Sequence, residues 1–390
     1  MTVPENDVTV RGANRGWKKT RLTELLGLDV PIVLGPFGGL SSVTLTAAVS
    51  NAGGLGSFGL YGYSAERIRQ TVDQLRSLTA APFNLNIWLD HEGASELHPT
   101  DDEFEAWLAP LKPYFTELGV PLPELPSQFL PAFDEQFESL LEARPAVASF
   151  VYGVPSAEVV DRCRRAGILT VGSATTVDEA LALDDGGVDA IVATGFEAGG
   201  HRPSFLRHAE ESLTGLFALL PQVVDAVSVP VIAAGGIADG RGIAAALTLG
   251  ADAALLGTAF LATEESAASD VHKAMISSDD ARRTILTRIY SGRLARGIPN
   301  RLYAELLPSA DDLAPFPAQN WIAGRFKPAA AQQGNAGLMS LWAGQGAPLA
   351  RGGSAAALMS ALESETARNL AGGGHTPEFR TPRNLFRASE

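Results

Sequence analysis

The chain has 390 residues and a hydrophobic fraction of 46%, enough for one barrel of about 200–250 residues with chain left over, or for two ordinary domains. A formal net charge of −14 argues against a general binder of nucleic acid or anionic membrane, which needs a basic surface. Cys163 is the one cysteine, which excludes an internal disulfide and a Cys-rich zinc site.

The N-terminal residues carry no targeting signal that we recognise. Residues 1–15 lack the apolar stretch of a signal peptide, and no uncharged apolar run of 18 residues follows anywhere in the chain. We therefore expect a cytoplasmic protein without a membrane span, beginning with an N-terminal arm over residues 1–20.

Eight short apolar segments predict β-strands, and several of them end in or near glycine. They cover residues 31–35, 54–59, 83–88, 147–153, 169–173, 190–193, 230–234 and 253–256. Helical patterns follow most of them, at residues 42–51, 64–78, 156–166, 177–184, 212–227 and 240–249. Residues 90–143 interrupt the alternation with prolines and acids, and we interpret them as an insertion with helices at 101–108 and 134–143.

Eight strands alternating with helices predict an α/β fold, a closed (β/α)8 barrel of the TIM type, over residues 21–265. Residues 266–371 are expected to form a mainly helical C-terminal subdomain that packs on the barrel. Residues 372–390 are interpreted as a tail.

The loop after the sixth strand, Thr194-Gly-Phe-Glu-Ala-Gly-Gly-His201-Arg, is the strongest local signal for a site. Active sites of such barrels lie at the C-terminal ends of the strands, and a histidine there can exchange a proton near neutral pH. The alternative is a histidine that only packs in the loop. The remaining histidines lack such surroundings and are expected at the surface: His91, His98, His208, His272 and His375. No histidines and carboxylates have the spacing of metal ligands, so we expect no metal.

Glycines follow the first, seventh and eighth strands, at Gly35, at Gly235 and Gly236, and at Gly257 before Thr258. Bare backbone N–H groups at helix starts bind phosphate, and the last two loops are the usual phosphate site of these barrels. The alternative is a set of ordinary tight turns. Gly53-Gly-Leu-Gly56 lacks the spacing of a dinucleotide fingerprint, which favours FMN over FAD.

Asn84 and Asn86 lie on the same side of the third strand, with Asn86 nearer its functional end. An amide that donates and accepts suits the edge of a heteroaromatic ring, although a cap on the next turn is equally compatible. Cys163 lies on a helix outside the barrel, as a structural thiol would, which excludes barrels that attack with a cysteine.

The chain resembles the nitronate monooxygenase family, formerly called 2-nitropropane dioxygenases. The resemblance rests on Pro31-Ile-Val-Leu-Gly-Pro-Phe-Gly-Gly, Ala47-Ala-Val-Ser-Asn-Ala-Gly-Gly-Leu-Gly-Ser57, Glu197-Ala-Gly-Gly-His201-Arg, Ala234-Gly-Gly-Ile237, Gly257-Thr258 with Phe260, and Trp342-Ala-Gly-Gln345-Gly. It spans about residues 22–349.

This resemblance implies an FMN-containing barrel in which His201 is the catalytic base. It implies cofactor contacts at Gly35, Pro36, Phe37, Asn86, Thr194, Glu197, Ala198, Gly199, Gly200 and Gln345, and phosphate contacts at Gly235, Gly236, Gly257 and Thr258. Leu34, Phe37 and Thr194 depart from residues common in the family and border the flavin, so the substrate can differ from simple nitroalkanes.

Nitroalkanes are carbon acids, so His201 would remove the α-proton and, as imidazolium, attract the nitronate anion. The expected partners are a small-molecule substrate and O2, the products a carbonyl compound and nitrite, and a homodimer stays open. The alternative enzyme is an FMN-dependent NAD(P)H reductase of quinones or enoyl thioesters. The alternative of another class is a non-catalytic binding protein on a barrel scaffold.

Overall fold

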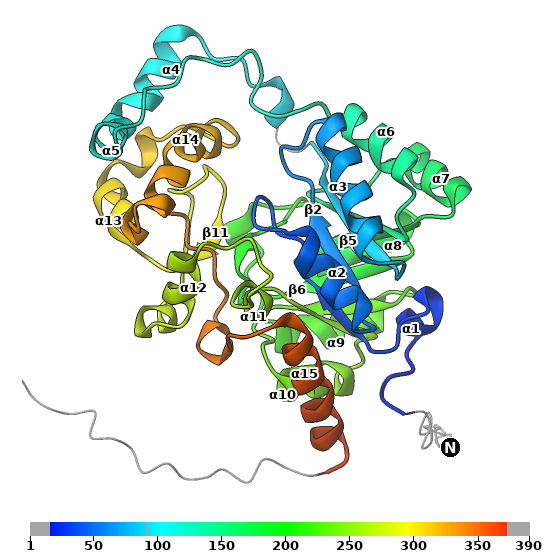
Figure 1. Ribbon diagram of the computed structural model, residues 1–390. Coiled ribbons are helices and arrows are strands. Elements are labelled where there is room, and N and C mark those ends of the chain that lie inside the picture. The colour runs from blue at the N-terminus through cyan, green and yellow to red at the C-terminus, as the bar shows by residue number, and fades with distance from the viewer. Residues whose placement is uncertain (1–15, 91–92, 373–390) are drawn as a thin grey trace, which may run out of the picture.

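The computed structural model describes residues 16–90 and 93–372, and its centre is a barrel of eight parallel strands (Figure 1). The strands are β1 (Ile32–Leu34), β2 (Gly56–Gly59), β3 (Phe83–Trp88), β4 (Val147–Val151), β5 (Leu169–Ala174), β6 (Ala190–Thr194), β8 (Val231–Ala234) and β9 (Ala253–Leu256). All eight predicted strands are present, and each is buried apart from a few positions.

The strand order is β1-β9-β8-β6-β5-β4-β3-β2, and backbone contacts between the two ends close the ring. Val33 forms a parallel bridge with Leu55, and the Leu55 N–H donates to Ile32 O at 2.9 Å. The register sets Asn86 level with Gly59 on one neighbouring strand and with Ser149 on the other. The expected TIM barrel is confirmed.

Helices cover the outside of the barrel and begin where the sequence provides caps. They are α2 (Val43–Asn51), α3 (Ala65–Leu78), α6 (Phe133–Ala143), α7 (Ala157–Ala166), α8 (Val177–Asp185), α9 (Leu216–Ala226) and α10 (Gly240–Thr248), with α1 (Arg21–Leu26) preceding β1. The Ser42 hydroxyl accepts from Leu45 N, Ser156 accepts from Val159 N, and Asp239 caps α10. The helix predicted from residue 212 begins only at Leu216.

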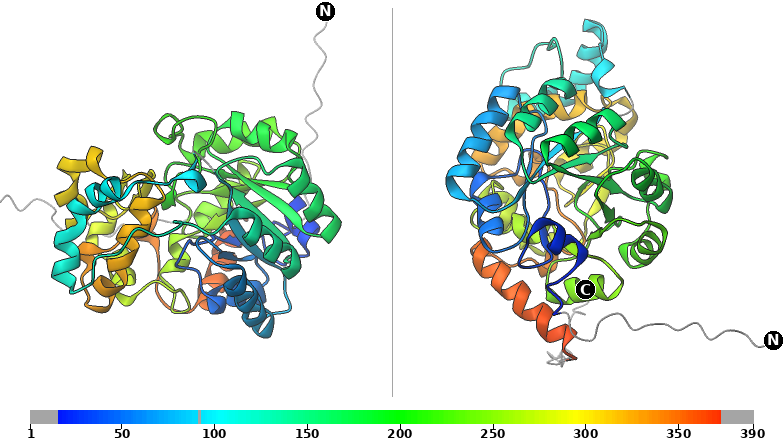
Figure 2. Two further views of the ribbon diagram at one scale, coloured as in Figure 1. Left: turned by 90° about the horizontal axis from the view of Figure 1, so that it is seen from above. Right: turned by 90° about the vertical axis from the view of Figure 1, so that its right-hand side faces the viewer.

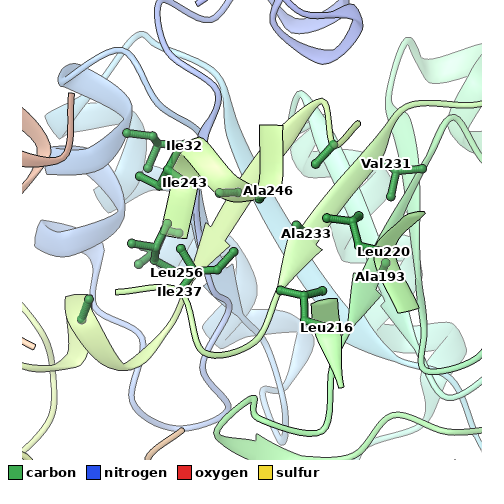
Figure 3. Close-up of a cluster of buried hydrophobic side chains, with 14 of the residues drawn as sticks. Ile32, Ala193, Leu216, Leu220, Val231, Ala233, Ile237, Ile243, Ala246 and Leu256 are labelled. Carbon is green, nitrogen blue, oxygen red and sulfur yellow. The ribbon is translucent and has the colours of Figure 1, made fainter. Parts of the chain in front are cut away.

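The hydrophobic core lies between the strands and these helices (Figure 3). Outward-facing side chains such as Ile32, Ala233 and Leu256 meet Leu220 and Ile243 from the helices, and all five are at most 1% exposed. Parallel strands covered by helices are apolar on both faces, which is why the sequence shows continuous apolar runs rather than alternation.

The last helix, α15 (Ala355–Leu370), was expected in the C-terminal subdomain, but it packs on the barrel. It packs against α10 and α2 and fills the place of the helix that should follow the eighth strand. A Cβ on Gly240 would lie 2.3 Å from the Cβ of Glu365, so only glycine allows α10 to approach α15 this closely. The C-terminal subdomain therefore interrupts the barrel rather than following it.

Five of the remaining helices form a second lobe beside the barrel. They are α4 (Asp101–Leu108), α5 (Lys112–Leu118), α12 (Asp270–Ile276), α13 (Arg301–Leu306) and α14 (Ala318–Gln332). The short α11 (Thr258–Leu261) follows β9 directly, and its Ala259 and Phe260 belong to the barrel core. In Figure 2 the cyan helices of the insertion lie with the yellow and orange helices at one side of the barrel. Phe115 of α5 meets Phe326 of α14 edge-on at 5.2 Å, so the two segments share one core. The predicted helix 134–143 is instead α6, which packs on α3 and β3.

A small antiparallel sheet joins the lobe to the barrel mouth. Its order is β10 (Ile285–Thr287), β11 (Ala295–Gly297) and β7 (Gly200–His201), with Ala295 opposite His201. The loop singled out after the sixth strand is thus held by backbone pairing to the lobe.

The histidines outside the predicted site differ in their exposure. His272 was expected at the surface and is instead 1% exposed, with Nε2 2.9 Å from Trp342 O, whereas His98 and His208 are exposed. His91, His375, residues 1–15 of the arm and residues 373–390 of the tail lie outside the described residues. Within the described ranges, no helix is both long and apolar enough to cross a membrane.

Candidate active site

A cavity of about 250 Å³ lies at the C-terminal mouth of the barrel, and most of the predicted site residues line it. His201 is among them. The predicted cofactor residues that line the cavity are Gly35, Pro36, Phe37, Asn86, Thr194, Ala198, Gly199, Gly200, Gly235, Gly236, Gly257 and Thr258.

Glu197 and Gln345 are the two predicted cofactor residues that do not line the cavity. The Glu197 carboxylate accepts from the Leu216 N–H at 2.8 Å, so it caps the start of α9. Gln345 is exposed, and its backbone N–H donates to Glu197 O at 2.9 Å. Both residues therefore hold loops together, and neither side chain reaches the cavity wall.

His201 is oriented by a hydroxyl from the second lobe. Its Nε2 lies 2.9 Å from Ser291 Oγ, which in turn donates its hydroxyl proton to Arg293 O at 3.1 Å. When that proton goes to Arg293 O, Ser291 accepts from the Nε2–H of His201, and this tautomer leaves Nδ1 unprotonated. Nδ1 has no hydrogen-bond partner among the described residues.

The charge state of His201 differs from the sequence expectation. Burial, together with the positive charges of Arg293 and Lys327, lowers the pKa of His201 to about 3. The imidazole is therefore neutral near pH 7, as a base must be, because burial disfavours the charged form. Before proton transfer, the positive charge near the ring therefore comes from Arg293 and Lys327 rather than from His201.

Two buried charged side chains anchor the His201 loop from behind. Arg202 is 1% exposed and donates to Gly195 O at 2.6 Å, to Thr194 O at 3.1 Å and to Ser212 O at 3.2 Å. Glu179 is completely buried and accepts from Phe205 N at 2.7 Å. Buried charges that satisfy several backbone groups fix a loop firmly, because breaking one contact leaves a buried polar group unpaired.

The glycine loops leave room for a ligand at the backbone. Gly235 and Gly236 have φ angles of 121° and 68°, which favour glycine. A Cβ on Gly257 would point toward the cavity, meeting only the Phe37 ring at 3.7 Å. Thr258 Oγ1 accepts from Gly344 N at 2.9 Å, which leaves its hydroxyl proton to donate. This cradle, which a side chain would fill, fits a phosphate group.

Asn86 presents one half of its amide to the cavity. Its Nδ2 donates to Ser149 Oγ at 3.0 Å and to Ser149 O at 3.1 Å. The carbonyl oxygen is left as an acceptor, which suits a ring N–H. Asn84 lies deeper on the same side of β3 and does not reach the cavity.

The Trp342-to-Gly346 segment closes the cavity by close backbone approach. A Cβ on Gly344 would lie 2.8 Å from Glu197 O, and one on Gly346 would lie 2.7 Å from Gly236 O. The motif therefore needs its glycines for packing, while the Trp342 ring lines the cavity 5.2 Å from that of His201.

Sequence reasoning missed several residues of the site. Trp88 could have been found, because period-two alternation puts it on the same side of β3 as Asn86. Tyr61 follows the predicted second strand closely, and Tyr152 lies near the end of the predicted fourth strand. Ser291 and Asn320 come from the second lobe, where no periodic pattern points to them.

Cys163 is fully buried, and burial raises the pKa of its thiol to about 11, which confirms a structural thiol. The described residues contain no group of three or more His, Cys, Asp or Glu side chains placed to hold a metal ion.

Comparison with known proteins gives consistent results. The nitronate monooxygenase family matches residues 19–365. A protein of Staphylococcus aureus (strain Newman) named "Probable nitronate monooxygenase" is 37% identical over 345 residues, covering 88% of this chain and 96% of its own. The nitroalkane oxidase of Streptomyces ansochromogenes superposes with a TM-score of 0.82 at 39% identity, covering 90% of this chain and 99% of its own. FabK of Thermotoga maritima gives 0.69 at 26% identity, over 91% and 98%.

Proposed function

The chain belongs to the nitronate monooxygenase family, and from this premise we propose that it oxidises nitroalkanes and their nitronates with O2, using FMN. It is a flavin-dependent enzyme. The observation that carries the proposed chemistry is the placement of His201 at the barrel mouth beside a glycine cradle, with Nε2 bonded to Ser291 and Nδ1 not bonded to any described residue.

The residues of this chain fit FMN. Gly235, Gly236, Gly257 and Thr258 would hold the phosphate through backbone N–H groups and one hydroxyl. Asn86 would accept from an N–H of the ring. When bound, the flavin supplies the electron transfer and the reaction with O2, which the side chains cannot supply.

His201 removes the α-proton of a neutral nitroalkane at Nδ1. Ser291 keeps the other nitrogen protonated, so the ring presents its lone pair to the substrate. Proton transfer creates an imidazolium beside a nitronate anion, and this new neighbouring charge favours the protonated ring that burial alone disfavours. The products are a carbonyl compound and nitrite.

The partners we propose are a small-molecule substrate and O2. The net charge of −14 supports a protein that does not bind nucleic acid, and one cysteine in 390 residues supports a cytoplasmic location. We propose no oligomeric state.

An oxygen electrode and a nitrite assay test the proposal together. Purified protein given ethyl nitronate in air should consume O2 and release nitrite, and its heat-released cofactor should chromatograph as FMN. Absence of nitrite would contradict the proposed reaction, and FAD would contradict the proposed cofactor.

The likeness to FabK favours one second candidate, an NAD(P)H-dependent reductase. That enzyme would be reduced by NADH or NADPH without oxygen and would not need a nitronate. Anaerobic bleaching by a nicotinamide at a higher rate than by a nitronate would select it.

A further inference from the structure

The mouth of the barrel is divided into two halves of different chemistry. In the strand order, β1, β9, β8 and β6 are consecutive neighbours, and the glycine loops of the cavity follow these four strands. Of the other four strands, β2, β3 and β4 end at or near aromatic residues that line the cavity, namely Tyr61, Trp88 and Tyr152, while β5 contributes Ser173. One half consists of glycine backbone suited to a phosphate and a ring edge. The other half consists of the rings of Tyr61, Trp88 and Tyr152, which we call the aromatic wall.

The aromatic rings form one connected wall that reaches His201. Trp88 lies 4.4 Å from Tyr61 and 5.0 Å from Tyr152, measured between ring centroids. The Trp88 ring is also 5.3 Å from that of His201, at an interplanar angle of 74°. The Trp342 ring lies 5.2 Å from that of His201. The proposed base therefore stands at the edge of the wall, between the two halves of the mouth.

All three rings of the wall line the cavity, although they differ in exposure. Tyr61 and Trp88 are partly exposed, whereas Tyr152 is 3% exposed. Tyr152 has a φ of 73°, a left-handed conformation that a bulky residue adopts only when its surroundings impose it. Its ring is held by the Arg293 guanidinium, 4.1 Å from the ring centroid, and Asn320 donates to the Tyr61 hydroxyl at 2.9 Å.

We propose that the preferred substrates are nitroalkanes and nitronates that carry an aryl group, which contacts Tyr61, Trp88 and Tyr152 while the carbon next to nitrogen faces His201. The three rings are tilted, Trp88 by 42° to Tyr61 and by 59° to Tyr152, so an aryl group meets them by a mixture of offset and edge-on contacts. Flat rings gain from offset and edge-on contacts with other rings, in addition to the burial of apolar area. Short nitroalkanes would leave the wall uncovered. This inference rests on the proposed function, since it names the substrate class of the same site.

A substrate series on the FMN-loaded enzyme tests the inference. The three nitronates are those of 2-phenylnitroethane, 2-cyclohexylnitroethane and nitroethane, and the quantity compared is kcat/KM. We expect the phenyl compound to exceed the nitroethane compound by about tenfold or more, from burial of its ring. We expect it to exceed the cyclohexyl compound by about threefold to tenfold, from ring contacts.

Two variants at one position separate the wall from general damage. Trp88→Leu should lose most of the phenyl-over-cyclohexyl preference, whereas Trp88→Phe should keep it. The ratio is taken within each variant, so a shared effect on His201 or on flavin content cancels. A phenyl preference unchanged in Trp88→Leu would overturn the inference.

A binding measurement keeps this inference distinct from the proposed function. Phenylacetate and acetate carry a planar two-oxygen anion like a nitronate but cannot be oxidised in this way, and their binding is followed by the visible spectrum of the flavin. Binding of phenylacetate about tenfold tighter than that of acetate supports the aryl site, whether or not nitronates are turned over. Lack of turnover together with this preference would reject only the proposed function. Turnover of nitronates without either preference would reject only the aryl class.

Discussion

His201 combines two properties that a lone histidine in a loop would not have. Its Nε2 is held by a hydrogen bond with Ser291, and burial beside Arg293 and Lys327 lowers its pKa, which keeps the ring neutral. The same features that make the ring a poor proton acceptor in an empty cavity make it respond strongly to a negative charge formed next to it.

Replacing His201 with asparagine should affect the two forms of the substrate differently. Activity on a neutral nitroalkane should fall by about 10²–10⁴-fold, because only this form needs a proton removed. Activity on the preformed nitronate should fall much less, because the resting histidine is neutral and contributes no positive charge. The measurement is kcat/KM for both forms at equal flavin content, and equal losses would mean that His201 orients the substrate without acting as a base.

The pH profile should show the lowered pKa of His201. The ring stays deprotonated from pH 8 down to pH 5, since its pKa is lowered to about 3 from an ordinary value near 6.5. Burial lowers the pKa of Lys327 to about 7, so this neighbouring group titrates within the interval, and the profile is measured in Lys327→Met, with freshly diluted substrate in its neutral form. In that variant kcat/KM for a neutral nitroalkane should stay level from pH 8 to pH 5. A drop centred near pH 6.5 would indicate an exposed base in place of the buried one.

At the scale of elements, the ends of the strands decide where the ligand can lie. Gly257 lies at the end of β9, and the space in front of it borders the ring of Phe37. A side chain there would project toward the space assigned to the phosphate without meeting any backbone atom within 4 Å.

Gly257→Leu should weaken FMN retention while leaving the barrel folded. Flavin content per protein after gel filtration should fall at least about tenfold, because the side chain displaces phosphate oxygens from the cradle. Gly352→Leu is the matched control, since a Cβ there meets nothing within 4 Å and Gly352 is exposed and does not line the cavity. A Gly257→Leu protein that retains its full flavin would place the phosphate elsewhere.

The strands and their ends could be predicted from the sequence because each carries a local signal. Buried parallel strands are short apolar runs, and the glycines after β1, β8 and β9 mark close approaches of the backbone. Helix starts were predictable where serine caps them, as at Ser42 and Ser156, and missed for α9, whose Gly215 cap has no side chain.

The half of the site that comes from the second lobe could not be predicted. Ser291 and Asn320 lie in irregular segments or on helices whose partners are distant in sequence. The position of α15 could not be predicted either. No local pattern indicates that a helix so far along the chain from the eighth strand packs against the barrel. The role of the Glu197 side chain was also not predictable. An acid in a glycine-rich loop suggests a ligand contact, whereas this carboxylate caps α9.

At the scale of the whole molecule, the lobe is part of the site rather than an appendage. Its strand β11 pairs with the His201 backbone, its Ser291 orients the ring, and the insertion after β3 completes its core. Stability of the lobe and geometry of the active site should therefore change together.

Phe326→Ala tests this coupling in the core that α5 and α14 share. The side chain is fully buried, so its loss should lower the free energy of unfolding by about 3–5 kcal/mol. Denaturant unfolding followed by tryptophan fluorescence gives the change, and kcat/KM under native conditions should fall with it. Phe217→Ala is the control, because Phe217 is 76% exposed and should change stability by less than about 0.5 kcal/mol. A Phe326→Ala protein as stable as the control would contradict the shared core.

The most direct test of the account is anaerobic reduction of the bound flavin, followed at its visible absorption band after mixing with an excess of an alkyl nitronate or of NADH. We expect rapid loss of absorption with the nitronate, at a rate that saturates with its concentration, and little change with NADH over the same time. Rapid bleaching by NADH with no response to the nitronate would contradict this expectation and identify the protein as a nicotinamide-dependent reductase.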